Sequence, residues 1–171
     1  ALREEPRFES VGDASQINDG IVTSLAQDPK GFLWLGGASG LMRYDGYQLR
    51  SFRLAPQQGL SNPMVRSVLA ARNGHIWVAS DGLGLARLDP ATAQWQVFET
   101  QRSRPDAPRA PAVRALAEDR QGGIWLGTLG AGVQRLEPGQ GTLSAYRKEQ
   151  GLPDDRVQSL LVDGRGDIWV G

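Results

Sequence analysis

The sequence predicts an all-β protein built from β-propeller blades of four antiparallel strands, a partial propeller with about three and a half blades. Tryptophan recurs at spacings of 43, 48 and 44 residues, short apolar runs flank each copy, and 22 glycines punctuate the 171 residues. A period of about 40 to 50 residues is typical of propellers and other repeat architectures. The tryptophans in register are Trp34, Trp77, Trp125 and Trp169.

The residues before each tryptophan repeat as well. A glycine stands three residues before it, and an aspartate stands six residues before it, except in the second copy, where Ala71 takes that place. Aspartate can accept hydrogen bonds from nearby backbone N–H groups and glycine can adopt a positive φ, so Asp-x-x-Gly predicts a tight turn. The aspartates are Asp28, Asp119 and Asp163, and the glycines are Gly31, Gly74, Gly122 and Gly166.

Each repeat divides into four predicted strands, which we name a to d in chain order. Strand a alternates aliphatic with polar or small residues, as in "IVTSLAQD" (21–28), and strand b carries the tryptophan between two aliphatic residues. A glycine-rich bend leads into strand c, and strand d follows with an aromatic residue, Phe52, Phe98 or Tyr146. The other copies of strand a are 64–71, 112–119 and 156–163; strand c falls at 41–45, 85–89 and 133–137, and strand d at 47–54, 93–100 and 142–149.

Pairs of helices can repeat with a similar period, but the composition disfavours them. Glycine and proline interrupt every window before about 10 to 12 helix-compatible residues accumulate. We therefore prefer strands throughout.

The register also sets the predicted blade boundaries. Residues 6–11, "PRFESV", match strand d because Phe8 precedes Phe52 by 44 residues. We expect 6–11 to be the outer strand of a ring-closing blade, followed by blade 1 at 12–54, blade 2 at 55–100, blade 3 at 101–149 and the start of blade 4 at 150–171. Closed propellers have about four to eight blades. We expect either the remaining blades of a longer protein or another copy of the chain to cover the open blade edges.

Composition argues against several classes of partner. Lysine plus arginine and aspartate plus glutamate both number 19, so no basic footprint predicts nucleic-acid binding. The lack of cysteine excludes disulfides and thiolate metal sites. The apolar runs are far shorter than the roughly 20 residues needed to cross a bilayer, so we expect no membrane contact by this segment.

Four copies of one longer motif run through the chain. They are "INDGIVTSLAQDPKGFLWLGGASGLMRYDG" (17–46), "GLSNPMVRSVLAARNGHIWVASDGLGLARLD" (59–89), "APAVRALAEDRQGGIWLGTLGAGVQRLE" (110–137) and "GLPDDRVQSLLVDGRGDIWVG" (151–171). This motif resembles the repeat of the two-component regulator propeller family, with its "GL" turn, "V-x-S" strand and "D-x-x-G-x-hydrophobic-W-hydrophobic-G-T" segment. Ala71 and Ala79 depart from the family's aspartate and glycine, and residues 102–111 replace the "GL" turn of the third copy.

The resemblance implies a periplasmic or extracellular sensor region at the front of a membrane receptor. Its output would be a histidine kinase or a diguanylate cyclase. The segment itself would be non-enzymatic and would bind a small molecule, a glycan or a protein. Two alternatives remain open: a propeller lyase or hydrolase, and a plain protein-interaction platform.

The enzyme alternative depends on a general base, which in some propeller lyases is a histidine. The one histidine, His75, occupies a turn position that carries Phe32, Gly123 or Asp167 in the other copies, so we predict no catalytic residue. One imidazole without cysteine or paired carboxylates does not form a typical zinc site, and we expect no metal and no cofactor.

Three further motifs that resemble functional sites have simpler structural interpretations. "GRGD" (164–167) contains an adhesion tripeptide, but by register it belongs to the turn between strands a and b. The glycine-rich bends lead into strands, whereas a phosphate-binding loop leads into a helix. The repeated aspartates are better explained as turn-capping side chains than as calcium ligands.

A ligand site, if present, is expected on the face where the d–a loops and the b–c bends gather around the channel mouth. The tryptophans of strand b are predicted to be packing anchors between blades, whereas Trp95 on strand d stands outside the repeat. The polar loop residues that form the candidate ligand site are Asn18, Asp19, Ser39, Ser61, Asn62, Asp81, Asp154 and Asp155.

Overall fold

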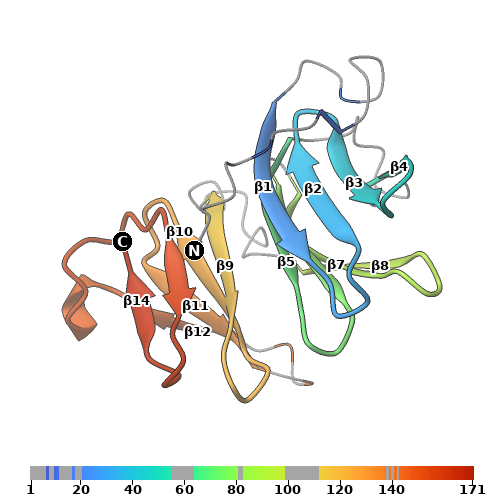
Figure 1. Cartoon of the computed structure of the whole chain (residues 1–171). Helices are drawn as coiled ribbons and strands as arrows, with labels where there is room; N and C mark the ends of the chain where they lie inside the picture. Colours follow the sequence, from blue (N-terminus) through green and yellow to red (C-terminus); the bar gives the residue numbers. More distant parts are fainter. Residues whose placement is uncertain are drawn as a thin grey trace, which may run out of the picture.

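The computed structural model describes residues 7, 10–11, 17, 21–54, 64–80, 83–98, 112–137, 139, 141 and 143–171. These residues form three four-stranded antiparallel sheets and one two-stranded sheet, which stand side by side (Figure 1). In each four-stranded sheet the strands are hydrogen-bonded in sequence order. The all-β blade architecture predicted from the sequence is confirmed.

Each sheet begins with strand a and continues in chain order, so the repeat of the sequence is also the repeat of the structure. Blade 1 comprises β1 (Val22–Gln27), β2 (Leu33–Gly37), β3 (Gly40–Tyr44) and β4 (Leu49–Phe52). Blade 2 comprises β5 (Val65–Ala70), β6 (Ile76–Ser80), β7 (Gly84–Asp89) and β8 (Gln94–Phe98). Blade 3 comprises β9 (Val113–Glu118), β10 (Ile124–Thr128), β11 (Val133–Leu136) and β12 (Leu143–Tyr146). A short 3₁₀ helix, η3 (Lys148–Gln150), precedes β13 (Leu160–Val162) and β14 (Ile168–Val170).

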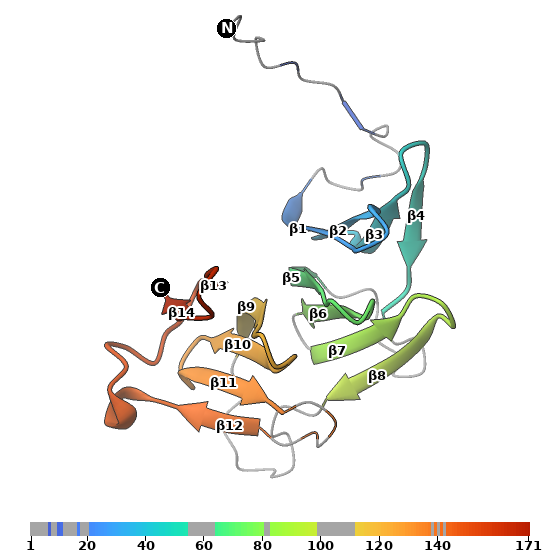
Figure 2. The same ribbon diagram turned by 60° about the horizontal axis from the view of Figure 1, so that its bottom comes forward.

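The blades fan out along an arc, with the first strand of each blade on its inner side. Figure 2 shows β1, β5, β9 and β13 along the inside of the arc and β4, β8 and β12 along the outside. Neighbouring inner strands contact one another, β1 with β5, β5 with β9 and β9 with β13. Two hydroxyls of β1 join the first pair: Thr23 Oγ1 donates to Val65 O (2.6 Å), and Ser24 Oγ accepts from Val68 N (2.9 Å).

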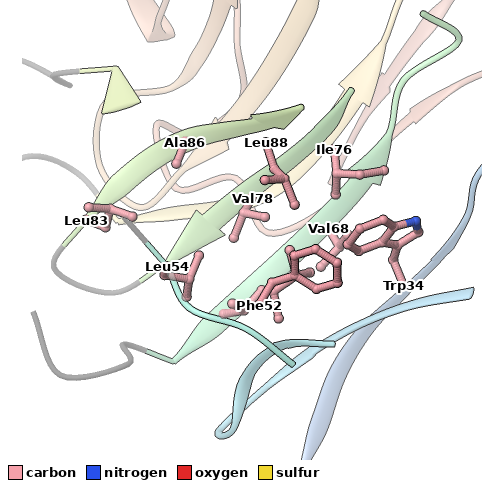
Figure 3. Close-up of a cluster of buried hydrophobic side chains, with 11 residues drawn as sticks. Trp34, Phe52, Leu54, Val68, Ile76, Val78, Leu83, Ala86 and Leu88 are labelled. Carbon is pink, nitrogen blue, oxygen red and sulfur yellow. The ribbon is translucent and has the colours of Figure 1, made fainter. Parts of the chain in front are cut away.

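The hydrophobic core lies between the blades, because each sheet packs one apolar face on the next. Trp34 is 0% exposed and belongs to a cluster that joins blade 1 to blade 2. Figure 3 shows its ring beside Phe52 of its own blade and Val68 and Ile76 of the next. A second cluster repeats the arrangement with Trp77 between blades 2 and 3. Trp95, the tryptophan outside the repeat, packs against the first cluster.

The glycine two residues after the tryptophan permits this close approach. A Cβ built on Gly36 would lie 2.4 Å from Val65 Cγ1, and one built on Gly127 would lie 2.8 Å from Val157 Cγ1. The second blade carries Ala79 at this position, and that residue is fully buried. The position therefore selects small residues because the next blade packs directly against it.

The predicted outer strand at 6–11 falls largely outside the described residues. Trp169 was expected to lie between blades, but its side chain is 62% exposed. In the other repeats the tryptophan packs against strand d of its own blade and against the following blade. Among the described residues, β14 has neither of these neighbours, so Trp169 is left uncovered.

Candidate functional site

The b–c bends differ among the blades, because the first copy has one residue fewer between its tryptophan and the acidic residue that ends strand c. In blade 1 Gly37 pairs with Gly40, so a two-residue turn containing Ser39 joins β2 to β3. In blade 2 Ser80 pairs with Gly84, which leaves three residues in the bend. Ser39 is partly buried in its turn. The candidates Asn18, Asp19, Ser61, Asn62 and Asp81 lie outside the described residues.

Asp154 and Asp155 hold the rim of blade 3 together. The carbonyl oxygen of Asp155 accepts hydrogen bonds from Gly130 N and Gly132 N, both at 2.9 Å. Its Oδ1 accepts from Lys148 N at 2.9 Å, where η3 begins. Asp154 Oδ1 accepts from Arg156 N at 2.8 Å. The two side chains thus position their own loop and the start of η3, whereas the backbone carbonyl of Asp155 holds the b–c bend. The proposed role of both residues in ligand binding stays a prediction.

In blades 1, 3 and 4 the aspartate of the a–b turn accepts hydrogen bonds from both the turn backbone and the tryptophan. Asp28 Oδ1 accepts from Lys30 N (2.9 Å) and Phe32 N (3.0 Å), while its Oδ2 accepts from Trp34 Nε1 (2.9 Å). Asp119 and Asp163 make the same bonds with Trp125 (2.9 Å) and Trp169 (3.1 Å). The predicted turn-capping role is correct, but the bond to the indole was not foreseen.

An arginine of strand c completes this unit. The guanidinium carbon of Arg43 lies 5.8 Å from the centre of the Trp34 ring. The corresponding distances are 5.7 Å between Arg87 and Trp77 and 5.8 Å between Arg135 and Trp125. At these distances the cation is attracted to the face of the indole ring. Sequence reasoning missed these arginines, although they recur at one position of strand c in "LMRYD", "LARLD" and "VQRLE".

In blade 3 the aspartate hydrogen-bonds to both the tryptophan and the arginine. Arg135 Nε donates to Asp119 Oδ2 at 2.7 Å, and Arg135 Nη1 also bonds Glu137 Oε1. Burial by itself raises the pKa of Asp119, but hydrogen bonds from Arg135, Trp125 and Gly123 N outweigh it and hold the pKa below its ordinary value. Asp119 is therefore a carboxylate at neutral pH.

Blade 2 lacks this acceptor because Ala71 stands in place of aspartate. Trp77 Nε1 is buried, and no described residue accepts a hydrogen bond from it. Asn73 compensates for part of the turn, since its Oδ1 accepts from His75 N at 3.1 Å. The indole of Trp77 is left with an unpaired donor, which costs free energy in the folded state.

Replacing Ala71 with aspartate is expected to raise the free energy of unfolding by about 1 to 2 kcal/mol, because the new carboxylate can accept from Trp77 Nε1 and face Arg87. Urea denaturation of wild type and Ala71→Asp would measure the gain. Combining the substitution with Trp77→Phe removes the indole donor and should abolish most of it. Equal gains in the two backgrounds would show that the indole is not the partner.

A cavity of about 300 Å³ opens between blades 1 and 2 on the opposite face, where the a–b and c–d turns lie. Blade 1 contributes Pro29, Lys30, Phe32 and Arg43 to its wall, and blade 2 contributes His75 and the Asp89–Ala91 turn. The Arg43 guanidinium lies over the Phe32 ring at 4.5 Å. The histidine that sequence reasoning set aside as a turn residue thus lines a cavity, away from the predicted ligand face.

Comparison with known families identifies the repeat. A family model described as "Two component regulator propeller" matches residues 16–39, 109–130 and 151–171. These three segments are two-component regulator propeller repeats. The matched regulator propeller segments belong to blades 1, 3 and 4, whereas the repeat with Ala71 and Ala79 lies outside them. No curated protein matches the chain.

Solved structures with the same fold include two extracellular domains from B. thetaiotaomicron. One belongs to BT4673, assigned as a one component system, and shares 21% identity with a TM-score of 0.77, covering 94% of this chain and 22% of that domain's chain. The other belongs to BT3049, assigned as a hybrid two component system, with 25% identity, a TM-score of 0.74, and coverage of 95% and 22%. The chain thus spans about 22% of the length of these extracellular domains.

Virginiamycin B lyase from Staphylococcus aureus also resembles the chain, at 13% identity and a TM-score of 0.69, over 90% of this chain and 50% of the lyase. At this identity the likeness is one of fold. In the part of the chain that the structure describes, no helix has the length and hydrophobicity of a membrane span.

Proposed function

We propose that the chain forms part of a ligand-sensing propeller in the periplasmic or extracellular region of a membrane-bound signalling receptor. The receptor's output is a histidine kinase or a diguanylate cyclase. The observation that supports this proposal is the repeat itself: three segments match the regulator propeller family, and the same blades occur in extracellular domains assigned to one- and two-component systems. The ligand is a small molecule, a glycan or a protein held by loops on one face of the propeller.

The full-length protein that contains this chain provides the test. Its sequence is expected to place a membrane-spanning segment and kinase or cyclase motifs beyond the propeller. Purified in vesicles, it is expected to phosphorylate itself from ATP or to convert GTP into cyclic di-GMP, and deletion of the propeller should change that rate. A full-length protein with neither activity and no membrane segment would overturn the proposal.

The lyase alternative has fold likeness in its favour, and it makes a different prediction. It requires an acid and a base that converge from neighbouring blades. Virginiamycin lyase activity of the full-length protein, lost on substitution of His75, would support that alternative over the sensor.

We also propose that further blades of the same propeller cover the two apolar ends of the arc. Leu25 on β1 is 65% exposed, and Leu161 on β13 is 61% exposed beside Trp169. Every junction within the chain packs the inner strand of one blade on the inner strand of the next, so each end presents one half of the same junction. Exposed apolar faces of this kind favour association.

The isolated 171-residue chain is therefore expected to self-associate, because a second copy can cover these faces when the other blades are missing. Light scattering over a range of concentrations would measure this, and Leu25→Lys should weaken the association. A chain that stays monomeric at every concentration would contradict the prediction.

A further inference from the structure

One position of the a–b turn determines how the blades meet on the face that carries the cavity. In blade 2 this position holds Arg72, whose Nη2 donates to the carbonyl oxygen of Asp119 in blade 3. In blade 3 it holds Arg120, whose Nη2 donates to the carbonyl oxygen of Gly164 in blade 4. Both arginines thus bridge a junction between consecutive blades.

The first junction has no such bridge. The equivalent residue of blade 1 is Pro29, whose side chain has no hydrogen-bonding group and cannot reach the turn of blade 2. The cavity of about 300 Å³ lies at this junction, and Pro29 forms part of its wall. The cavity thus lies at the junction whose a–b turn carries proline at the position where the next two blades carry arginine.

The wall of the cavity contains nitrogen atoms without partners. Arg43 Nε and His75 Nδ1 are both buried, and neither makes a hydrogen bond to any described residue. They come from opposite sides of the junction, Arg43 from strand c of blade 1 and His75 from the a–b turn of blade 2. Buried polar groups in native proteins are nearly always paired, so an acceptor would be favourable here. Protein atoms cover both nitrogens, so an acceptor in the cavity reaches them only when the covering side chains shift.

The acidic groups of the wall, in contrast, are already engaged. Asp28 accepts three hydrogen bonds from its own blade, two at Oδ1 and one at Oδ2. Asp89 Oδ1 accepts from Ala91 N at 2.9 Å. Arg72, also in the wall, is directed toward blade 3, with its Nε 3.4 Å from Glu118 Oε2. In the described part of the chain neither carboxylate accepts a hydrogen bond from Arg43 Nε or His75 Nδ1, whereas in blade 3 Asp119 accepts from Arg135 Nε.

We propose that the junction between blades 1 and 2 binds a monoanionic carboxylate with a small apolar body. The carboxylate accepts from Arg43 and His75 and lies within reach of the exposed Lys30, while Phe32, Pro90 and Ala91 contact the apolar part. The nearby carboxylates of Asp28 and Asp89 disfavour a dianion, so a carboxylate is preferred to phosphate. This inference does not rest on the proposed receptor function, because binding can be measured on the chain by itself.

Benzoate is a suitable probe, with benzamide as a neutral molecule of the same shape and inorganic phosphate as the competing oxyanion. Calorimetry should detect saturable binding of benzoate at one site, and NMR should show shifts of the Arg43 Nε–H and His75 ring signals. Benzamide and phosphate should bind more weakly. No saturable binding of benzoate, or equal binding of benzamide, would overturn the proposal.

Matched variants locate the site. Arg43→Met should weaken benzoate binding by about tenfold or more, because a charge-assisted hydrogen bond is lost. Arg87→Met is the control: Arg87 holds the same position over Trp77, but it bonds Gln96 Oε1 (2.6 Å) and does not line the cavity. Pro29→Arg should also abolish binding by filling the junction. Retained binding in Arg43→Met, or equal losses in Arg43→Met and Arg87→Met, would refute the assigned site.

Discussion

Asp119→Ala is expected to lower the free energy of unfolding by about 3 to 5 kcal/mol at neutral pH. The carboxylate of Asp119 is buried, with 5% of the residue exposed, and it accepts from Gly123 N (2.8 Å), Trp125 Nε1 (2.9 Å) and Arg135 Nε (2.7 Å). Its removal leaves the indole and the largely buried guanidinium without that acceptor. Urea denaturation followed by tryptophan fluorescence would measure the loss.

The effect should depend on pH in a defined direction. The folded-state pKa of Asp119 is lowered, so the unfolded chain binds the proton more readily than the folded one. The stabilising contribution is therefore fully present above the ordinary pKa of aspartate, about 3.9, and is lost as the pH falls through the lower folded-state value. The difference in stability between wild type and Asp119→Ala should shrink below about pH 4. A difference that stays constant into that acid range would contradict this account.

Asp163→Ala provides the matched control. Asp163 has the same place in its turn, and the Trp169 indole and the Asp167 backbone N–H lower its pKa. However, Trp169 is exposed to water, and no described arginine pairs with Asp163. Its replacement should cost much less than that of Asp119. Equal losses would mean that the turn bonds, and not the buried indole and guanidinium, carry the effect.

Trp34→Ala is expected to destabilise the chain by about 3 to 5 kcal/mol, through lost apolar contacts and the cavity that remains. Trp34 is 0% exposed, packs at 5.0 Å from the Phe52 ring, and joins blade 1 to Val65 and Val68 of blade 2. If the alanine variant does not fold, Trp34→Phe keeps an aromatic ring and should show a smaller loss. Both can be compared by thermal and urea denaturation.

Trp169 occupies the same repeat position, and Trp169→Ala should have little effect on the stability of the monomeric chain at low concentration, because the residue is already 62% exposed there. A large loss for Trp169→Ala, or a negligible one for Trp34→Ala, would show that burial between blades is not what stabilises the repeat.

The sequence predicted the elements well because their signals are local. The a–b turn combines an aspartate, replaced by Ala71 in the second copy, with a glycine at positive φ three residues later, and Gly31, Gly74, Gly122 and Gly166 all have φ between 85° and 96°. The strands, three to six residues long, followed from the alternation of side chains. The candidate site was less predictable. Neither Pro29 nor His75 has a local pattern that indicates a cavity, because the cavity depends on two turns about 40 residues apart.

The sequence by itself determined the number, order and strand composition of the repeats, and it assigned the same role to Asp28, Asp119 and Asp163. Only the tertiary structure decided which residues at equivalent repeat positions differ in burial and in contacts. Trp34 is buried and Trp169 is exposed because burial requires a neighbouring blade. Arg72 and Arg120 bridge their junctions by hydrogen bonds, whereas Pro29 lines a cavity at the first junction. The physical reason is that turns and strands form from interactions within one repeat, whereas packing, bridging hydrogen bonds and cavities belong to the contact between two.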